Sequence, residues 1–105
     1  MHGNLICDAI QRRRLLRFHY KDHSTATTVE PYVYGVNTAG HAVLSAWLVA
    51  GATHDTGPER WRLYLDNQMR LVEVLADEFH STRPDYKVDD ERFRLIRCQI
   101  EPSVP

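Results

Sequence analysis

The sequence lacks most of the patterns by which enzymes and metal-binding proteins are recognised. It contains no glycine-rich phosphate loop and no G-x-S-x-G motif, and no pair among its six histidines has the spacing of a helical zinc motif. Its two cysteines, Cys7 and Cys98, are too far apart in sequence to form a zinc knuckle. We therefore expect a protein that is not an enzyme and that carries no metal and no cofactor.

Long hydrophobic runs are also missing. The longest mostly apolar run, 42–52, is too short to span a bilayer, and no N-terminal stretch has the charged-then-apolar order of a signal peptide. These absences predict a cytoplasmic protein without a membrane partner, in which Cys7 and Cys98 remain reduced. Both cysteines fall in segments expected to be helical, so we expect them to be packed core thiols.

Neither sign of charge is in excess. The 105 residues carry 13 basic and 14 acidic side chains, and the net charge of −1 excludes a uniformly basic surface. The length and the ordinary hydrophobic content of 43% predict one globular domain over residues 1–105. The charge is uneven, because residues 1–23 contain five basic and two acidic residues and carry +3. Their arginines form either a solvated helix end or a patch that contacts phosphate.

Hydrophobic periodicity predicts one helix followed by five short strands. The helix is expected over residues 4–14, with Asn4 as its cap. Its apolar stripe consists of Leu5, Ile6, Ala9 and Ile10. Pro31 lies inside the second strand and predicts an edge or a bulge there. The strands are expected at 16–20, 29–36, 41–50, 59–65 and 71–75, with loops at 37–40, 51–58 and 80–86.

The segment 90–100 fits two patterns. A helix would begin at Asp89 or Asp90, where the helix dipole favours negative charge. A strand is the alternative, because Ile96 and Cys98 alternate with polar residues. We favour the helix. Five short strands with tight turns then predict a small, strongly bent barrel with an N-terminal and a C-terminal helix.

Aromatic residues are interleaved with arginines along the predicted strands. Aromatic rings stack on bases and arginine neutralises phosphate, so this composition is typical of surfaces that bind single-stranded nucleic acid or nucleotides. The alternative is that most of these aromatic side chains lie in the core, which we favour for the two tryptophans. The set comprises Tyr20, Tyr32, Tyr34, Trp47, Trp61 and Tyr64, with Arg60 and Arg62.

Several short segments follow one another along the chain in a recognisable order and spacing. They are Ala9-Ile10 with 14–20, Val29-Glu30-Pro31 with Tyr34-Gly35, Gly40, 61–66 with Leu71 and Val74, and Phe79, Arg83, Pro84 and Tyr86. In this order and spacing the chain resembles the WYL domain family, in particular its short stand-alone members. The tripeptide after which the family is named is here Ala42-Val43-Leu44, so only the leucine is kept.

The resemblance implies an Sm-like, SH3-type five-stranded barrel. In larger relatives this domain is a sensor attached to a helix-turn-helix DNA-binding domain, and it is thought to bind nucleic acid or another negatively charged ligand. A helix-turn-helix does not fit beside the barrel in 105 residues, so we expect no direct repressor role for this chain alone.

These observations predict a non-enzymatic regulatory module that binds an anionic ligand, either a nucleotide or single-stranded nucleic acid. The alternative is a protein-interaction module that forms a homodimer or binds a partner protein through strand edges. A third hypothesis, an enzyme that uses His41 with Asp66 or Glu30, is the least favoured. The expected ligand-binding residues are Tyr20, Tyr34, His41, Trp61 and Arg62, with Arg13 and Arg17 as phosphate neighbours.

Overall fold

A computed structural model describes residues 2–51 and 60–101 as one helix and six strands. Most of the predicted loop 51–58 and the first residue of the strand predicted at 59–65 lie outside the described residues. The elements, in chain order, are α1 (Gly3–Arg12), β1 (Arg14–Tyr20), β2 (Thr27–Asn37), β3 (Ala42–Ala50), β4 (Trp61–Leu65), the 3-10 turn η1 (Asp66–Gln68), β5 (Met69–Glu78) and β6 (Phe93–Gln99).

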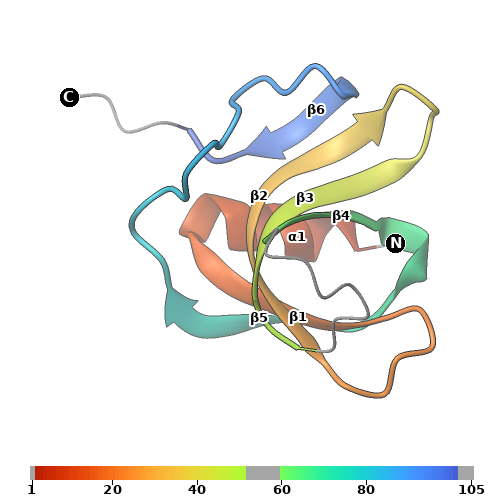
Figure 1. The fold of residues 1–105 in the computed structure, drawn as a ribbon, viewed down its shortest axis with the longest axis vertical. Helices are drawn as coiled ribbons and strands as arrows, with labels where there is room; N and C mark the ends of the chain where they lie inside the picture. The colour runs from red at the N-terminus through yellow and green to blue at the C-terminus, as the bar shows by residue number, and fades with distance from the viewer. Residues whose placement is uncertain (1, 52–59, 102–105) are drawn as a thin grey trace.

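The strands form one antiparallel sheet in the order β4-β3-β2-β1-β5, which bends around α1 (Figure 1). The long strand β2 has two neighbours in succession, because its first residues pair with β1 and its last residues pair with β6. The expected bulge is present, since the register between β2 and β3 shifts between Pro31 and Val33. The hairpin turn is also as predicted, with Gly40 at a φ of 87°.

The prediction of a closed five-stranded barrel is wrong, because the described strands form an open, six-stranded sheet. In a closed barrel the two end strands would pair with each other. Here β4 pairs with β3 and β5 pairs with β1, and no ladder joins β4 to β5 in the described parts of the chain. The sixth strand instead pairs with the second half of β2.

Helix α1 packs into the bend of the sheet through Ile6, Ala9 and Ile10, all of which are buried. Leu5, expected on the same stripe, is 44% exposed. The cap also differs from the prediction: the cap position is His2, whose backbone N–H donates to the buried carboxylate of Asp66 at 3.1 Å. A carboxylate from a distant turn therefore replaces the local cap expected at Asn4. Across the described residues, no helix has the length and apolar character needed to cross a membrane.

The predicted C-terminal helix is wrong, and the segment forms β6. The alternating pattern, kept as the alternative, decides the structure because β6 pairs along the second half of β2. Gly35 allows this approach, since a Cβ atom there would lie 2.0 Å from the carbonyl oxygen of Leu95. Asp90 caps no helix. It accepts hydrogen bonds from the Arg92 guanidinium, and these bonds lower the pKa of its carboxyl.

The expectation of reduced thiols is also wrong, because Cys7 and Cys98 form a disulfide with their Cα atoms 5.8 Å apart. Cys98 lies on a strand and not on a helix. Helix α1 and β6 lie beside each other in the fold, which brings together two cysteines separated by 91 positions. Sequence spacing carries no signal for a pairing of this kind.

Replacing Gly35 with alanine is expected to destabilise the protein by about 2–3 kcal/mol, because the new methyl group would collide with the β6 backbone. The control is Gly40→Ala, where nothing lies within 4 Å of the added Cβ and only the positive φ is unfavourable. We expect that control to lose about 1 kcal/mol. Urea denaturation compares the two variants, and equal losses would contradict the close contact between β2 and β6.

Candidate ligand-binding site

The segment between β5 and β6, residues 79–92, crosses the outer face of the sheet, and we call it the strap. Figure 1 shows it running from β5 along one side of the molecule to β6. Its contacts reach three strands in turn: Arg83 meets β2 and β3, and the carbonyl of Pro84 meets β4. The strap therefore has a fixed position on the sheet even though it contains no helix or strand.

An ion pair between Arg83 and Glu30 holds the centre of the strap. The guanidinium donates two hydrogen bonds to the carboxylate, at 2.9 and 2.8 Å. The side chain of Glu30 is only 6% exposed and that of Arg83 is 43% exposed, so the anion is buried and the cation reaches solvent. The hydroxyl of Tyr32 donates to Glu30 at 3.1 Å and accepts from the backbone N–H of Arg83 at 3.0 Å. This forked pairing raises the pKa of Arg83.

Four aromatic side chains in mutual contact lie beside this ion pair, and we call them the aromatic cluster: Tyr32, Trp47, Trp61 and Tyr86. The centroids of the contacting rings are 4.9–6.2 Å apart, and two of the four contacts are edge-to-face. The Arg83 guanidinium lies 5.2 Å from the centroid of the Trp47 ring. Trp47 and Trp61 are only partly buried, so they are not the full core residues that the sequence favoured.

Hydrogen bonds fix the aromatic cluster to the strap and to the end of β6. The Trp61 indole N–H donates to the carbonyl of Pro84 at 2.8 Å. The Tyr86 hydroxyl donates to the carbonyl of Ile100 at 2.6 Å. The rings are therefore held in place, which is the arrangement that lowers the entropy lost when a planar ligand stacks on them.

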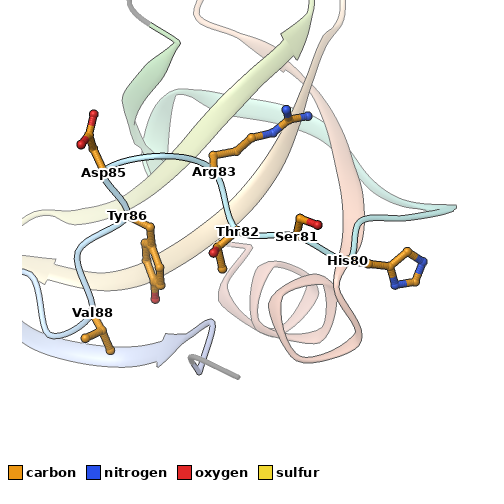
Figure 2. Close-up of a pocket in the computed structure, with 7 residues that line it drawn as sticks. All are labelled: His80, Ser81, Thr82, Arg83, Asp85, Tyr86 and Val88. Carbon is orange, nitrogen blue, oxygen red and sulfur yellow. The ribbon is translucent and has the colours of Figure 1, made fainter. Parts of the chain in front are cut away.

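Two hollows flank the strap and share Asp85 and Tyr86. The larger, of about 680 Å³, is lined by strap residues alone, 80–83, 85, 86 and 88. Figure 2 shows Thr82 and Tyr86 pointing to one side of the strap, while the Arg83 guanidinium reaches the other way across the strands. The smaller hollow, of about 250 Å³, contains Trp61 and Lys87. Polar and aromatic groups thus border open space on both sides of the strap.

The structure brings some of the predicted site residues together and separates others. Trp61 belongs to the aromatic cluster, and Arg62 donates to its backbone carbonyl at 3.2 Å. Arg13 donates to the carbonyl of Glu101 at 2.9 Å, and its charge partly opposes the rise in the pKa of Tyr86 that burial causes. Trp61 and Arg13 therefore lie at the strap, and Arg62 is the chain neighbour of Trp61.

The other four predicted residues have separate environments. Arg17 forms an exposed ion pair with Glu73. The Tyr20 hydroxyl accepts from the backbone N–H of Leu65. The remaining two are Tyr34, which is 4% exposed and donates to Asp66 at 2.5 Å, and His41, which is exposed at the end of the β2–β3 turn.

Sequence reasoning did not place Glu30, Arg83 or Tyr86 in the site. Glu30 and Arg83 are separated by 53 positions, and no local pattern links them. The one available signal was the family resemblance, which includes Glu30, Arg83 and Tyr86 without giving them a role.

Burial raises the pKa of most tyrosine hydroxyls. The pKa values of Tyr34, Tyr64 and Tyr86 are raised to about 12, with loss of solvation as the first cause in each. For Tyr34 the hydrogen bond to Asp66 adds to this effect, and for Tyr86 the carboxylate of Glu101 does so. The pKa of Tyr32 is raised further still, because burial is reinforced by the charge of Glu30.

These shifts predict a loss of stability at high pH. A tyrosine with a raised pKa in the folded state stabilises the protein fully below its unfolded value of about 10, and this contribution falls as pH rises from there toward the folded value. We expect the urea midpoint to decrease between about pH 10 and pH 12. The tyrosinate absorbance of the folded protein should meanwhile show the hydroxyls of Tyr32, Tyr34, Tyr64 and Tyr86 still largely protonated at pH 11. Full ionisation by pH 11 while the chain stays folded would contradict the burial of these hydroxyls.

Comparison with known proteins finds similarity at the level of fold. No family model matches the sequence, and no curated protein matches it. Among solved structures, the fold is similar to part of proteasome accessory factor B/C (PafBC) of Arthrobacter aurescens, with a TM-score of 0.62 and 20% identity. The match covers 83% of this chain but only 13% of the PafBC chain. At this identity the similarity concerns the fold alone.

Proposed function

We propose that the chain is a non-enzymatic regulatory module of the WYL type. Its ligand is anionic and carries a planar ring, as a nucleotide or single-stranded nucleic acid does, and it binds at the strap. The fold shared with part of PafBC and the resemblance to the WYL family support the class of module. The site itself is argued from the side chains at the strap.

The observation that carries the proposal is the position of the Arg83 guanidinium over Trp47, whose ring continues through Trp61 to Tyr86 in a row of ring contacts. Proteins that bind single-stranded nucleic acid combine aromatic rings, on which bases stack, with cations that contact the phosphates. Here both kinds of group border the same hollows. The rings are already fixed by hydrogen bonds, so little ordering is needed when a base binds.

One further cation lies within reach of a bound phosphate, because Lys87 lines the smaller hollow. In the described residues, no ion pair joins Lys87 to a carboxylate. Arg62 lines neither hollow and donates to the carbonyl of its neighbour Trp61. Arg12 is paired with Asp8 on the surface of α1. Lys87 is therefore the group from which we expect salt-dependent affinity.

The test is a titration of the protein with single-stranded oligothymidylate and, separately, with adenosine triphosphate. Binding is measured by tryptophan fluorescence at several salt concentrations. We expect quenching and an affinity that falls as salt rises, because phosphate contacts release counterions. Replacing Lys87 with glutamine should lower the slope of log affinity against log salt by about one.

The matched control is Arg12→Gln, which removes one positive charge from the far surface of α1 and should leave the slope unchanged. Binding without quenching, or a slope that Arg12→Gln alters as much as Lys87→Gln does, would place the ligand elsewhere. The absence of binding by both probes at low salt would contradict the proposed function.

A second candidate, assembly through strand edges, is favoured by exposed leucines on the outer strands. Leu63 on β4, Leu71 on β5 and Leu95 on β6 are 47%, 71% and 61% exposed. Large apolar side chains on strands that have one unpaired edge are a common route to association. Sedimentation over a range of concentrations distinguishes the two candidates. A self-association that Leu71→Asp abolishes would support assembly, whereas a monomer at every concentration would exclude a homodimer.

A further inference from the structure

We propose that the Cys7–Cys98 disulfide is a redox-sensitive cross-link between α1 and β6. It holds β6, and with β6 the strap, in the position that the ligand site needs. The effect on ligand binding rests on the function proposed above. The structural part of the proposal, release of β6 and the strap on reduction, stands on the contacts of this region alone.

The sheet holds β6 by one edge alone. Strand β6 lies off the main strand order and pairs with the second half of β2. That ladder shifts register twice, between Tyr34 and Gly35 and again between Val36 and Asn37. Strand β3, in contrast, is paired on both edges. We therefore expect β6 to open more easily than β3.

The main further attachment of β6 is to helix α1. Only two specific bonds join them: the disulfide, and an exposed hydrogen bond from Arg97 to Asn4 at 2.8 Å. An exposed hydrogen bond exchanges readily with water and adds little stability. The covalent bond is thus the principal link between β6 and the helix, which packs in the bend of the sheet.

Movement of β6 is transmitted to the strap by hydrogen bonds. The side chain of Gln99 accepts from the backbone N–H of Asp89 at 3.0 Å and donates to its carboxylate at 2.8 Å. The Tyr86 hydroxyl donates to the carbonyl of Ile100, just beyond β6. If β6 separates from the sheet, Tyr86 and Asp89 lose these partners. Tyr86, which belongs to the aromatic cluster and lines both hollows, is then no longer held.

The chemistry requires a dithiol reductant. Both cysteines are only partly buried, at the rim of the core, where a small thiolate can approach. A thiolate of the reductant attacks one sulfur, forms a mixed disulfide and releases the other cysteine as a thiolate. The second thiol of the reductant then displaces the first cysteine and closes a cyclic disulfide. The cystine gains two electrons and two protons, and the dithiol loses them.

Hydrogen exchange measured by mass spectrometry tests whether the disulfide holds β6 and the strap. The full chain is measured in its oxidised form and after reduction with dithiothreitol. The measured quantity is the ratio of exchange rates between the amides of β6 with the strap and those of β3. Because both rates come from the same sample, a change in global stability affects them together. We expect the ratio to rise by about tenfold or more on reduction, since local opening then precedes global unfolding.

The control is the double variant Cys7→Ser/Cys98→Ser, which should show the raised ratio with or without dithiothreitol. A ratio that reduction leaves unchanged in the natural chain would overturn the proposal. So would complete unfolding on reduction, in which the rates of β6 and β3 become equal.

A binding measurement then tests whether the disulfide affects the affinity of the ligand site. Oligothymidylate is titrated into the oxidised chain and into the reduced chain, and we expect about tenfold weaker binding after reduction. Equal affinity in both states would contradict control of the site by the disulfide. If the oligonucleotide binds neither state, the proposed function is wrong. The ratio of exchange rates still decides whether the disulfide holds β6 in the sheet.

Discussion

Replacing both Cys7 and Cys98 with serine is expected to lower the free energy of unfolding by about 4–5 kcal/mol. The disulfide joins positions that are 91 residues apart, so it restricts nearly the whole unfolded chain. The loop-entropy relation gives about 4.6 kcal/mol for a loop of this length, near the upper end of the values usually observed. Because domains of this size are typically stable by about 5–15 kcal/mol, the loss is a large fraction of the total.

Urea denaturation measures this loss. The natural chain and the double variant are unfolded with and without dithiothreitol, and their midpoints are compared. The natural chain should lose stability when the reductant is present, whereas the variant should be unaffected. If the natural chain has the same midpoint in both conditions, Cys7 and Cys98 are not bonded in solution.

Replacing Arg83 with methionine is expected to have the second largest effect, a loss of about 3 kcal/mol. The substitution leaves the Glu30 carboxylate, which is 6% exposed, without the guanidinium that pairs with it. Removing one partner of a buried ion pair usually destabilises a protein by about 3–5 kcal/mol. The lower end applies here, because the Arg83 side chain is 43% exposed and its charge is partly screened.

Two variants serve as controls for Arg83→Met. Arg17→Met breaks the ion pair with Glu73, in which both side chains are about half exposed, and should lose less than about 1 kcal/mol. Combining Glu30→Gln with Arg83→Met removes the buried charge as well and should recover part of the loss. If Arg83→Met and Arg17→Met have equal effects, the Arg83 ion pair does not hold the strap.

Local patterns in the sequence predicted most of the first five strands. The alternation of Leu16, Phe18 and Tyr20 correctly indicated β1, and Pro31 correctly indicated a bulge in β2. The turn at 37–40 was also predicted, because Asn and Gly have conformational preferences that depend little on the rest of the fold. Signals of this kind are local, and local signals are visible in a single sequence.

The features that sequence reasoning missed depend on long-range contacts. The segment 93–100 has a pattern that suits either a helix or a strand, and its pairing with β2 past Gly35 decides between them. The disulfide and the Glu30–Arg83 pair join positions 91 and 53 residues apart. The interleaved aromatic residues and arginines indicated that such side chains share a surface, but the course of the strap decides which aromatic and arginine side chains meet.

The most direct test of the strap as the ligand site is the backbone and indole N–H spectrum of the oxidised chain during titration with single-stranded oligothymidylate. We expect the two tryptophan indole signals and the amides of residues 80–83 and 85–88 to shift together, with one affinity. Shifts confined to the turn at 37–41 or to β5, with the strap and indole signals unchanged, would contradict this expectation.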